Sequence, residues 1–200
     1  PWLAVRMHAY TPWELKVKVA NLVRLGTGEP KIFNDDVAIP ALLAHGVDFH
    51  EARNYQVVGC VEPDVSGKCY GWKDCGHMNV AKVLELALND GRCLHCGPSC
   101  ARWAKCGAKG ERLGPQTGSL ADMTSFDQVL EAYDKQMKYW CDRQVAVLNA
   151  VDLAHQAVRP LPFLSQLMDG CIEKGKDVTW GGTKYNFTGP QGVGIGTAAD

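Results

Sequence analysis

Residues 1–60 alternate short apolar segments with segments of helical character, and this order constrains the fold more than any other feature of the chain. Thr11 as the N-cap and Pro12 at the first helical position open one helix, which Gly26 closes. A strand, a helix and a second strand in this order are typical of parallel strands joined by a crossover helix. The sequence therefore predicts an α/β fold, with strands over 2–7, 31–35 and 55–60 and helices over 11–25, 36–45 and 48–53.

Helical patterns continue through the rest of the chain and end in a glycine-rich segment. A helix over 79–89 is amphipathic, and Ser125 with Gln128 forms a capping box that opens a long helix. This helix stops near Val158, because the residue before Pro160 disfavours the helical conformation. Further segments predict a helix over 163–174, a strand over 178–182 and a glycine-rich loop over 185–196. The stripe expected to face inward on the long helix comprises Phe126, Val129, Leu130, Tyr133, Met137, Trp140, Val147, Leu148 and Val151.

The composition is that of an ordinary soluble globular protein. Charged residues make up 22% and hydrophobic residues 46% of the 200 residues, and the formal net charge is -1. Because neither sign of charge dominates, we expect no nucleic-acid partner and no binding to an anionic membrane. No apolar run is long enough to span a bilayer, and no signal peptide is recognised. The start at Pro1-Trp2 and the end at Asp200 lead us to expect an internal piece of a longer protein.

Nine cysteines are many for this length, and four of them gather in one segment of low periodicity. The odd count without a secretory signal favours reduced thiols in a cytoplasmic protein over a disulfide framework. Clustered thiolates are able to ligate zinc or an iron–sulfur cluster, and the alternative is a cysteine-rich loop without an ion. The usual zinc pattern has two CxxC knuckles, whereas this segment has one. The candidate ligands, with His95 among them, are Cys93, Cys96, Cys100 and Cys106.

A thiol and a carboxylate stand together where the third predicted strand ends. Cys60 follows Gly59, and Glu62 comes two residues later. Chemistry in α/β folds gathers at the carboxyl ends of strands, because a rigid scaffold holds the loops there. Asp74 and His77 follow just before the next helix and offer a general acid and base to the same pocket. The alternatives are a small buried cysteine, a solvated Glu62, and capping or packing roles for Asp74 and His77.

Longer segments resemble, in the same order, the glycyl radical enzymes of the pyruvate formate-lyase-like superfamily. The matching segments are GCVEP (59–63), GKCYGWKD (67–74), LELALNDGR (84–92), RLGPQTGSLADM (112–123), YDKQMKYW (133–140), AHQAVRPLPFLS (154–165) and GGTKYNFTGPQGVGIGTAAD (181–200). The resemblance implies that residues 1–200 form part of a ten-stranded α/β barrel domain. The Arg-Val-x-Gly-aromatic motif that holds the glycyl radical in this family does not occur in the chain, so we expect the C-terminal glycyl radical domain to be absent.

The resemblance also implies roles for the residues near the strand end. Cys60 carries a thiyl radical that takes a hydrogen atom from a substrate carbon, and Glu62 deprotonates the hydroxyl next to the substrate radical. Asp74 falls where dehydratase-type members carry a pocket acid that assists the leaving group. His77 falls where choline-type members carry an aromatic residue, which argues against choline or hydroxyproline as the substrate. The Cys-Val-Glu form of the motif predicts radical elimination, in which a dehydratase or lyase cleaves a C–O, C–N or C–S bond of a small polar substrate.

Two other functions stay open from the sequence. One is radical C–C chemistry, either addition of a hydrocarbon to fumarate or decarboxylation of an arylacetate. The other is a non-catalytic metal-binding module with zinc or an iron–sulfur cluster on the clustered cysteines. The resemblance further implies a small-molecule substrate, a glycyl radical and no dissociable organic cofactor, a radical S-adenosylmethionine activating enzyme, and a homodimer or larger assembly. We also expect the cytoplasm of an anaerobic organism as the location, and no activity from the isolated piece.

Overall fold

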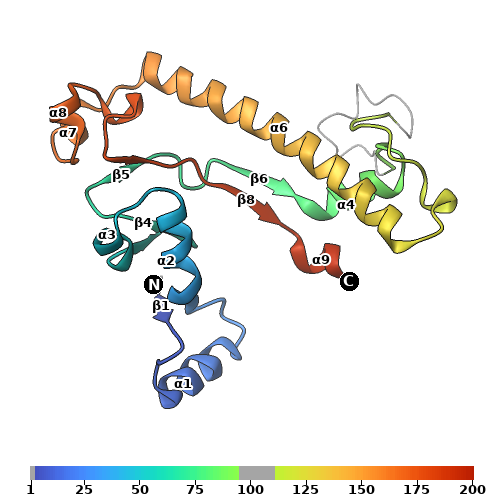
Figure 1. The fold of residues 1–200 in the computed structure, drawn as a ribbon, viewed down its shortest axis with the longest axis horizontal. Helices are drawn as coiled ribbons and strands as arrows, with labels where there is room; N and C mark the ends of the chain where they lie inside the picture. Colours follow the sequence, from blue (N-terminus) through green and yellow to red (C-terminus); the bar gives the residue numbers. More distant parts are fainter. Residues whose placement is uncertain (1–2, 95–110) are drawn as a thin grey trace. The chain divides into compact units, whose positions relative to one another are not determined.

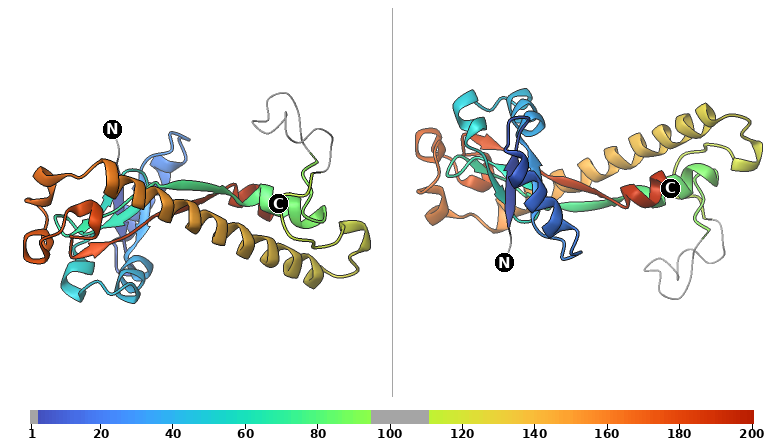
Figure 2. Two further views of the ribbon diagram at one scale, coloured as in Figure 1. Left: turned by 90° about the horizontal axis from the view of Figure 1, so that it is seen from above. Right: turned by 90° about the horizontal axis from the view of Figure 1, so that it is seen from below.

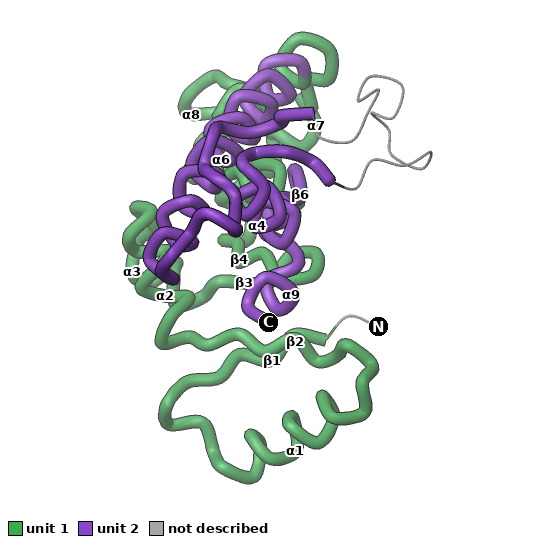
Figure 3. The backbone as a smooth tube through the Cα atoms, turned by 90° about the vertical axis from the view of Figure 1, so that its right-hand side faces the viewer, with its two compact units in different colours: residues 1–74, 155–189 green, residues 75–154, 190–200 purple. Residues whose placement is uncertain are grey.

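The structure, a computed structural model, describes residues 3–94 and 111–200. These residues form two compact units, and Figure 1 gives the chain order of their elements while Figure 3 colours the units separately. The units comprise residues 1–74 with 155–189 (unit 1) and residues 75–154 with 190–200 (unit 2). Each unit therefore joins segments that lie far apart in the sequence. None of the described helices is long and apolar enough to cross a membrane.

Unit 1 opens with the predicted strand–helix–strand arrangement. β1 (Ala4–Met7) pairs in parallel with β2 (Lys31–Asn34), and α1 (Trp13–Val23) connects them. The predicted start of α1 is wrong, because Pro12 occupies the N-cap position. The Thr11 hydroxyl does not cap the helix and accepts a backbone N–H of the preceding turn at 2.9 Å.

Two helices follow β2 and pack against the core of unit 1, to which each contributes one buried residue. α2 (Asp35–Ala44) begins after Asn34, whose side chain accepts the N–H of Asp36 at 3.0 Å. α3 (Phe49–Arg53) begins after Asp48, whose carboxylate caps it in the same way. Both helices confirm the predictions. The buried residues of this core are Leu42, Val47, Ala52, Tyr55, Val65 and Cys69.

The third predicted strand is shorter than expected and belongs to an antiparallel hairpin. β3 (Gln56–Val58) pairs with β4 (Glu62–Asp64), and residues 59–61 form the turn. Parallel pairing is therefore wrong at this point, because so short a connection cannot make the crossover that parallel strands require. The predicted parallel pairing is confirmed for β1 with β2. β5 (Cys69–Tyr70) also pairs in parallel with β7 (Tyr185–Asn186), although the sequence predicted neither strand.

A partly buried ion pair ties β1 to α2 and to the residue before β3. The Arg6 guanidinium donates to both carboxylate oxygens of Asp35, at 2.9 and 2.8 Å, and the Tyr55 hydroxyl donates to Asp35 at 2.7 Å. The guanidinium carbon also lies 3.9 Å from the centre of the Tyr55 ring. The hydrogen bond from Arg6 lowers the pKa of Asp35, and burial raises the pKa of Tyr55 to about 12.

The C-terminal part of unit 1 contains short helices where the sequence predicted one helix and a strand. The elements are α7 (Pro162–Ser165), α8 (Cys171–Lys174) and the 3-10 helix η2 (Val178–Trp180). The continuous helix over 163–174 is wrong, because α7 ends at Ser165 and turns over 166–170 follow, with Gly170 at a φ of +96° directly before α8. The strand over 178–182 is wrong, because the Asp177 carboxylate caps a helical turn by accepting the N–H of Thr179 at 2.9 Å.

The Glu51 carboxylate of α3 accepts hydrogen bonds from three side chains, which lie in β7 or directly before β5 and β7. It accepts from the Lys184 ammonium at 2.8 and 2.9 Å, from the Lys68 ammonium at 2.6 Å, and from the Tyr185 hydroxyl. The hydrogen bonds from Lys184, Lys68 and Tyr185 lower the pKa of Glu51 to about 2. This carboxylate therefore fastens α3 to the two parallel strands.

We expect the Glu51 carboxylate to make the free energy of unfolding of unit 1 depend on pH. The pKa of Glu51 is about 2 in the folded state and 4.5 ordinarily, so its stabilisation is complete above pH 4.5 and is lost as the pH falls from 4.5 towards 2. Glu51→Gln should lower the free energy of unfolding at neutral pH by about 1 kcal/mol, since the ion pairs are partly exposed and screened by water. The variant should also unfold with a shallower pH dependence than the wild type in urea titrations across this range. If the free energy of unfolding fell equally with pH in the variant and in the wild type, the low pKa assigned to Glu51 would be contradicted.

Unit 2 is built around another pair of parallel strands. β6 (Gly76–Asn79) pairs with β8 (Pro190–Val193), and the two strands lie side by side in Figures 1 and 2. α4 (Val80–Leu88) follows β6 directly, and α9 (Ile195–Ala199) follows β8. The Asn79 side chain caps α4 by accepting the N–H of Lys82 at 3.0 Å, which confirms the helix predicted over 79–89. The segment predicted as a glycine-rich loop thus contains two strands and the start of α9.

The long predicted helix is confirmed as α6 (Phe126–Val158), which follows the 3-10 helix η1 (Leu120–Asp122). Its predicted inward stripe is confirmed in part: Leu148 is buried and Val129, Tyr133, Met137 and Trp140 are partly buried, whereas Phe126, Leu130, Val147 and Val151 are exposed among the residues that the structure describes. Phe126 is 71% exposed and Val147 is 62% exposed, whereas Leu148 is 6% exposed. The described residues bury only a short stretch of this helix, so most of its apolar side chains lie uncovered. The fully or nearly buried side chains of α6 are Ala132, Gln136 and Leu148.

The close approach of β5 and β7 depends on Gly71. A Cβ atom there would lie 1.8 Å from the carbonyl oxygen of Phe187, and the φ of Gly71 is +152°. Gly71→Ala must push the two strands apart, so we expect a loss of about 3 kcal/mol in the free energy of unfolding. Gly196→Ala is the matched control, because a Cβ there meets nothing within 4 Å. Urea denaturation of both variants measures the difference, and equal midpoints would refute the predicted clash.

Candidate active site

Cys60 lies at the centre of the tight turn between β3 and β4. Val58 and Glu62 form the last pair of the hairpin, and Gly59, Cys60 and Val61 connect them. Gly59 has a φ of +59°, and a Cβ atom there would lie 2.6 Å from Oε2 of Glu62. Only glycine leaves room for the Glu62 carboxylate to fold back against this turn. The contact between Gly59 and the Glu62 carboxylate therefore explains why a glycine stands before Cys60.

The Glu62 carboxylate is held over the turn that carries the thiol. Its Oε2 accepts the backbone N–H of Val61 at 2.9 Å, and the residue is 8% exposed. Cys60 is a free cysteine and is half-buried. The structure thus brings together the two residues that the sequence singled out first. A carboxylate and a thiol in one rigid turn are able to act on neighbouring atoms of a single small substrate.

Asp74 and His77 are separated by the boundary between the units. Asp74 is the last residue of unit 1, after β5, and is exposed. His77 lies in β6 of unit 2, where it is exposed and pairs in register with Gln191 of β8. Asn79 caps α4, so the capping role considered for Asp74 is not needed. The placement of Asp74 and His77 in one pocket with Cys60 stays a prediction.

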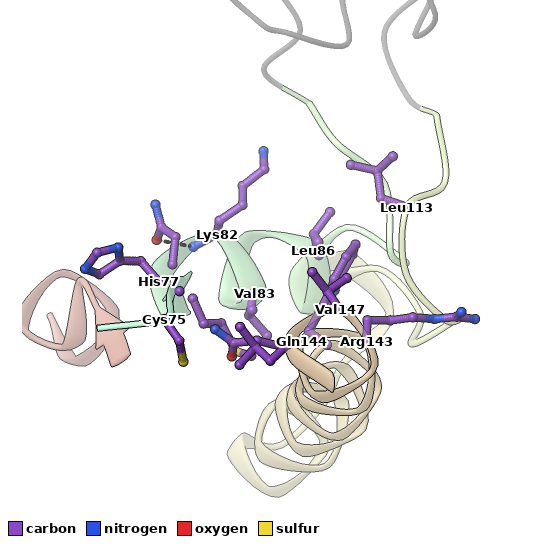
Figure 4. A pocket seen from close by; sticks show the side chains of 14 residues that line it. Cys75, His77, Lys82, Val83, Leu86, Leu113, Arg143, Gln144 and Val147 are labelled. Carbon is purple, nitrogen blue, oxygen red and sulfur yellow. Dashed lines mark hydrogen bonds between the residues drawn. The ribbon is translucent and has the colours of Figure 1, made fainter. Parts of the chain in front are cut away.

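Unit 2 contains a cavity of about 450 Å³ between β6, α4 and α6. Figure 4 shows its lining, with Val83 and Leu86 on α4 facing Val147 on α6. The charged ends of Lys82 and Arg143 extend away from its centre. The full lining is Cys75, Gly76, His77, Met78, Asn79, Lys82, Val83, Leu86, Leu113, Trp140, Arg143, Gln144, Val147 and Leu148. This cavity is mainly apolar, and the sequence did not predict it.

The proposed metal ligands lie mostly outside the described residues. Cys96, Cys100 and Cys106 fall within 95–110, whereas Cys93 is buried and its sulfur accepts from the Lys82 ammonium at 3.1 Å. Within 3–94 and 111–200, no three His, Cys, Asp or Glu side chains form a group that could hold a metal ion. The metal site on the four cysteines therefore stays a prediction.

The two ends of this cysteine-rich segment are fastened to each other in unit 2. The N–H of Cys93 donates to the carbonyl of Glu111 at 3.1 Å, and the N–H of Leu113 donates to the carbonyl of Gly91 at 2.8 Å. The Asp90 carboxylate accepts hydrogen bonds from the Arg112 guanidinium and from the backbone N–H groups of Thr117 and Gly118. The hydrogen bond from Arg112 lowers the pKa of Asp90 to about 2.

Comparison with known proteins gives a consistent family. The pyruvate formate lyase-like family model matches residues 1–200. The chain is 44% identical, over its whole length, to (2S)-3-sulfopropanediol dehydratase from Klebsiella oxytoca, and it covers 23% of that protein. It is 33% identical to trans-4-hydroxy-L-proline dehydratase from Clostridioides difficile, with 98% of this chain and 23% of the relative covered. The glycerol-bound glycerol dehydratase structure from Clostridium butyricum superposes with a TM-score of 0.77 at 41% identity, over 98% of this chain and 23% of that chain.

The chain belongs to the pyruvate formate-lyase-like family, and its relatives are glycyl radical dehydratases and lyases. It spans 23% of the length of the curated relatives that it matches first. The predicted family and the predicted α/β fold are confirmed, and the mixture of helices and parallel strand pairs is consistent with part of a barrel.

Proposed function

We propose that this chain is part of a glycyl radical enzyme that eliminates a leaving group from a small polar substrate. The observation that carries the proposal is the Gly59-Cys60-Val61-Glu62 turn, in which a buried carboxylate is folded back against the backbone that carries a half-buried thiol. The similarity to diol and hydroxyproline dehydratases supports the same class of reaction. The activity belongs to the whole enzyme, of which this chain supplies one part.

Each step of the proposed elimination has a side chain in this chain to perform it. The glycyl radical, held elsewhere in such an enzyme, supplies the unpaired electron. Cys60 takes a hydrogen atom from the substrate carbon that bears a hydroxyl group, and Glu62 takes the proton of that hydroxyl. The bond between the neighbouring carbon and its leaving group then breaks, and Asp74 donates a proton to the departing group. Cys60 returns its hydrogen atom to the neighbouring carbon, so a diol becomes an aldehyde and water.

The proposal includes a partner and a setting. A radical S-adenosylmethionine activating enzyme installs the radical, the whole enzyme forms a homodimer or larger assembly, and the reaction takes place in the cytoplasm of an anaerobic organism. Radical C–C chemistry, by fumarate addition or arylacetate decarboxylation, is the alternative outcome of the assay below. A metal-binding module on Cys93, Cys96, Cys100 and Cys106 is the other alternative, and metal analysis of the purified protein tests it.

The test uses the full-length parent enzyme, activated without oxygen by its activating enzyme. Propane-1,2-diol, glycerol and (2S)-3-sulfopropanediol are offered separately, and aldehyde formation is measured together with the glycyl radical signal in electron paramagnetic resonance. We expect turnover of at least one of these diols at a rate that follows the radical content. A strong radical signal with consumption of a hydrocarbon and fumarate, or of an arylacetate, and without any aldehyde would contradict the proposal.

A further inference from the structure

A nearly buried ion pair adjoins the Cys60–Glu62 turn within unit 1. The Lys73 ammonium lies 3.1 Å from Oδ1 of Asp64 and donates to the sulfur of Cys69 at 2.7 Å. The side chains of Lys73 and Asp64 are 15% and 10% exposed, so both charges are largely removed from water. Burial raises the pKa of Cys69 to about 11, so this thiol stays protonated and Asp64 is the group that neutralises Lys73.

Contacts from the other side hold Lys73 in place. A Cβ atom on Gly189 would lie 2.6 Å from the carbonyl oxygen of Lys73, and the Gly189 N–H donates to the Trp72 carbonyl at 2.7 Å. The Lys73 ammonium also lies 5.3 Å from the centre of the Phe187 ring, within the range of cation–π attraction. Lys73 therefore connects β4 with the segment that follows β7.

The two charges stand beside the two groups that elimination needs. Residues two apart in a strand point to the same face, and Glu62 and Asp64 of β4 are both buried. Asp74 follows Lys73 directly in the chain. The proposed base and the proposed acid are thus each attached, by a very short stretch of backbone, to one partner of the same ion pair.

We propose that the Lys73–Asp64 ion pair is a positioning clamp that sets the distance between the base Glu62 and the acid Asp74. This inference rests on the proposed elimination, because that reaction requires both groups in place at one substrate. A displacement of about 1 Å costs on the order of 10²-fold in rate. Removal of one charge leaves the other unpaired in a water-poor site, so the backbone around it is expected to shift.

The test uses the activated full-length enzyme with the diol that it turns over fastest. Asp64→Asn and Lys73→Met each remove one charge at nearly constant shape, and the double variant removes both. Asp35→Asn is the matched control, because Asp35 is also partly buried and paired in unit 1, with Arg6, but has no chain connection to the proposed groups. The readouts are kcat per glycyl radical, KM, and deuterium wash-in from solvent into recovered substrate, which requires hydrogen abstraction, exchange of the Cys60 thiol with solvent and return to the same carbon, but no elimination.

We expect each single variant to lose about 10- to 100-fold in kcat per radical, with KM changed less than about 3-fold and with wash-in retained. The double variant should lose no more than the worse single variant, because the two residues act as one unit. The control should keep the wild-type ratio of elimination to wash-in. A wild-type kcat in Asp64→Asn and Lys73→Met, or an equal fall of elimination and wash-in, would overturn the clamp. Absence of elimination in the wild type would instead defeat the proposed function.

Discussion

Cys60→Ala in the activated full-length enzyme is expected to abolish turnover, by at least about 10⁴-fold, while the glycyl radical signal persists. Cys60 is the half-buried free thiol at the centre of the β3–β4 turn, and the proposed reaction begins and ends with a hydrogen atom on its sulfur. An alanine side chain has no bond from which a thiyl radical forms, so abstraction from substrate stops. The measurement pairs product analysis with quantitative electron paramagnetic resonance on the same sample.

Cys141→Ala is the matched control for this substitution. Cys141 is also a free cysteine, but it is exposed on α6. The control should keep wild-type turnover per radical. Turnover by Cys60→Ala within tenfold of the wild type would show that another group abstracts the hydrogen atom, and the role of the turn would then have to be abandoned.

Glu62→Gln is expected to lower elimination by about 10²- to 10⁴-fold, the range that a positioned acid or base contributes. The amide oxygen of glutamine is still able to accept the N–H of Val61 and to lie against Gly59, so the turn should keep its shape. The amide cannot accept the substrate proton, whereas Cys60 still abstracts hydrogen. Wash-in of deuterium from solvent into recovered substrate should therefore continue while aldehyde formation nearly stops.

Glu14→Gln controls for the loss of a carboxylate as such, since Glu14 is an exposed residue in the first turn of α1. It should leave both elimination and wash-in at wild-type levels. Loss of wash-in together with elimination in Glu62→Gln would place Glu62 in the abstraction step or in folding, and would contradict its role as the base.

Local sequence patterns correctly predicted the first strands and helices of unit 1. The order β1–α1–β2 was predicted from the alternation of strand-like and helical segments, and the helices over 36–45 and 48–53 were predicted without their capping residues, Asn34 and Asp48. The hairpin was missed because antiparallel pairing depends on the length of the connection after Val58, and the third strand was expected to run through Cys60. The break over 166–170 was missed because the apolar pattern of 163–174 continues across these turns and across Gly170, which takes a left-handed conformation.

The site was predictable in part. Cys60 and Glu62 stand out because they flank one residue at a strand end, and the structure explains Gly59 as the residue that makes room for the carboxylate. Period-two spacing from Glu62 would have pointed to Asp64, but no sequence pattern shows that Lys73 reaches it. The inward stripe of α6 was inferred from periodicity alone, which identifies an apolar face but not the segment that covers it.

Deuterium transfer within the substrate tests the central claim most directly. The activated full-length enzyme is given a diol that carries deuterium on the carbon from which Cys60 is proposed to take hydrogen. A primary isotope effect on kcat/KM, with part of the deuterium on the neighbouring carbon of the aldehyde, is the predicted result, because the sulfur that removes the atom also returns it when its S–H bond has not first exchanged with solvent. An isotope effect near unity, with only solvent hydrogen on that carbon, would contradict abstraction by Cys60 and the elimination built on it.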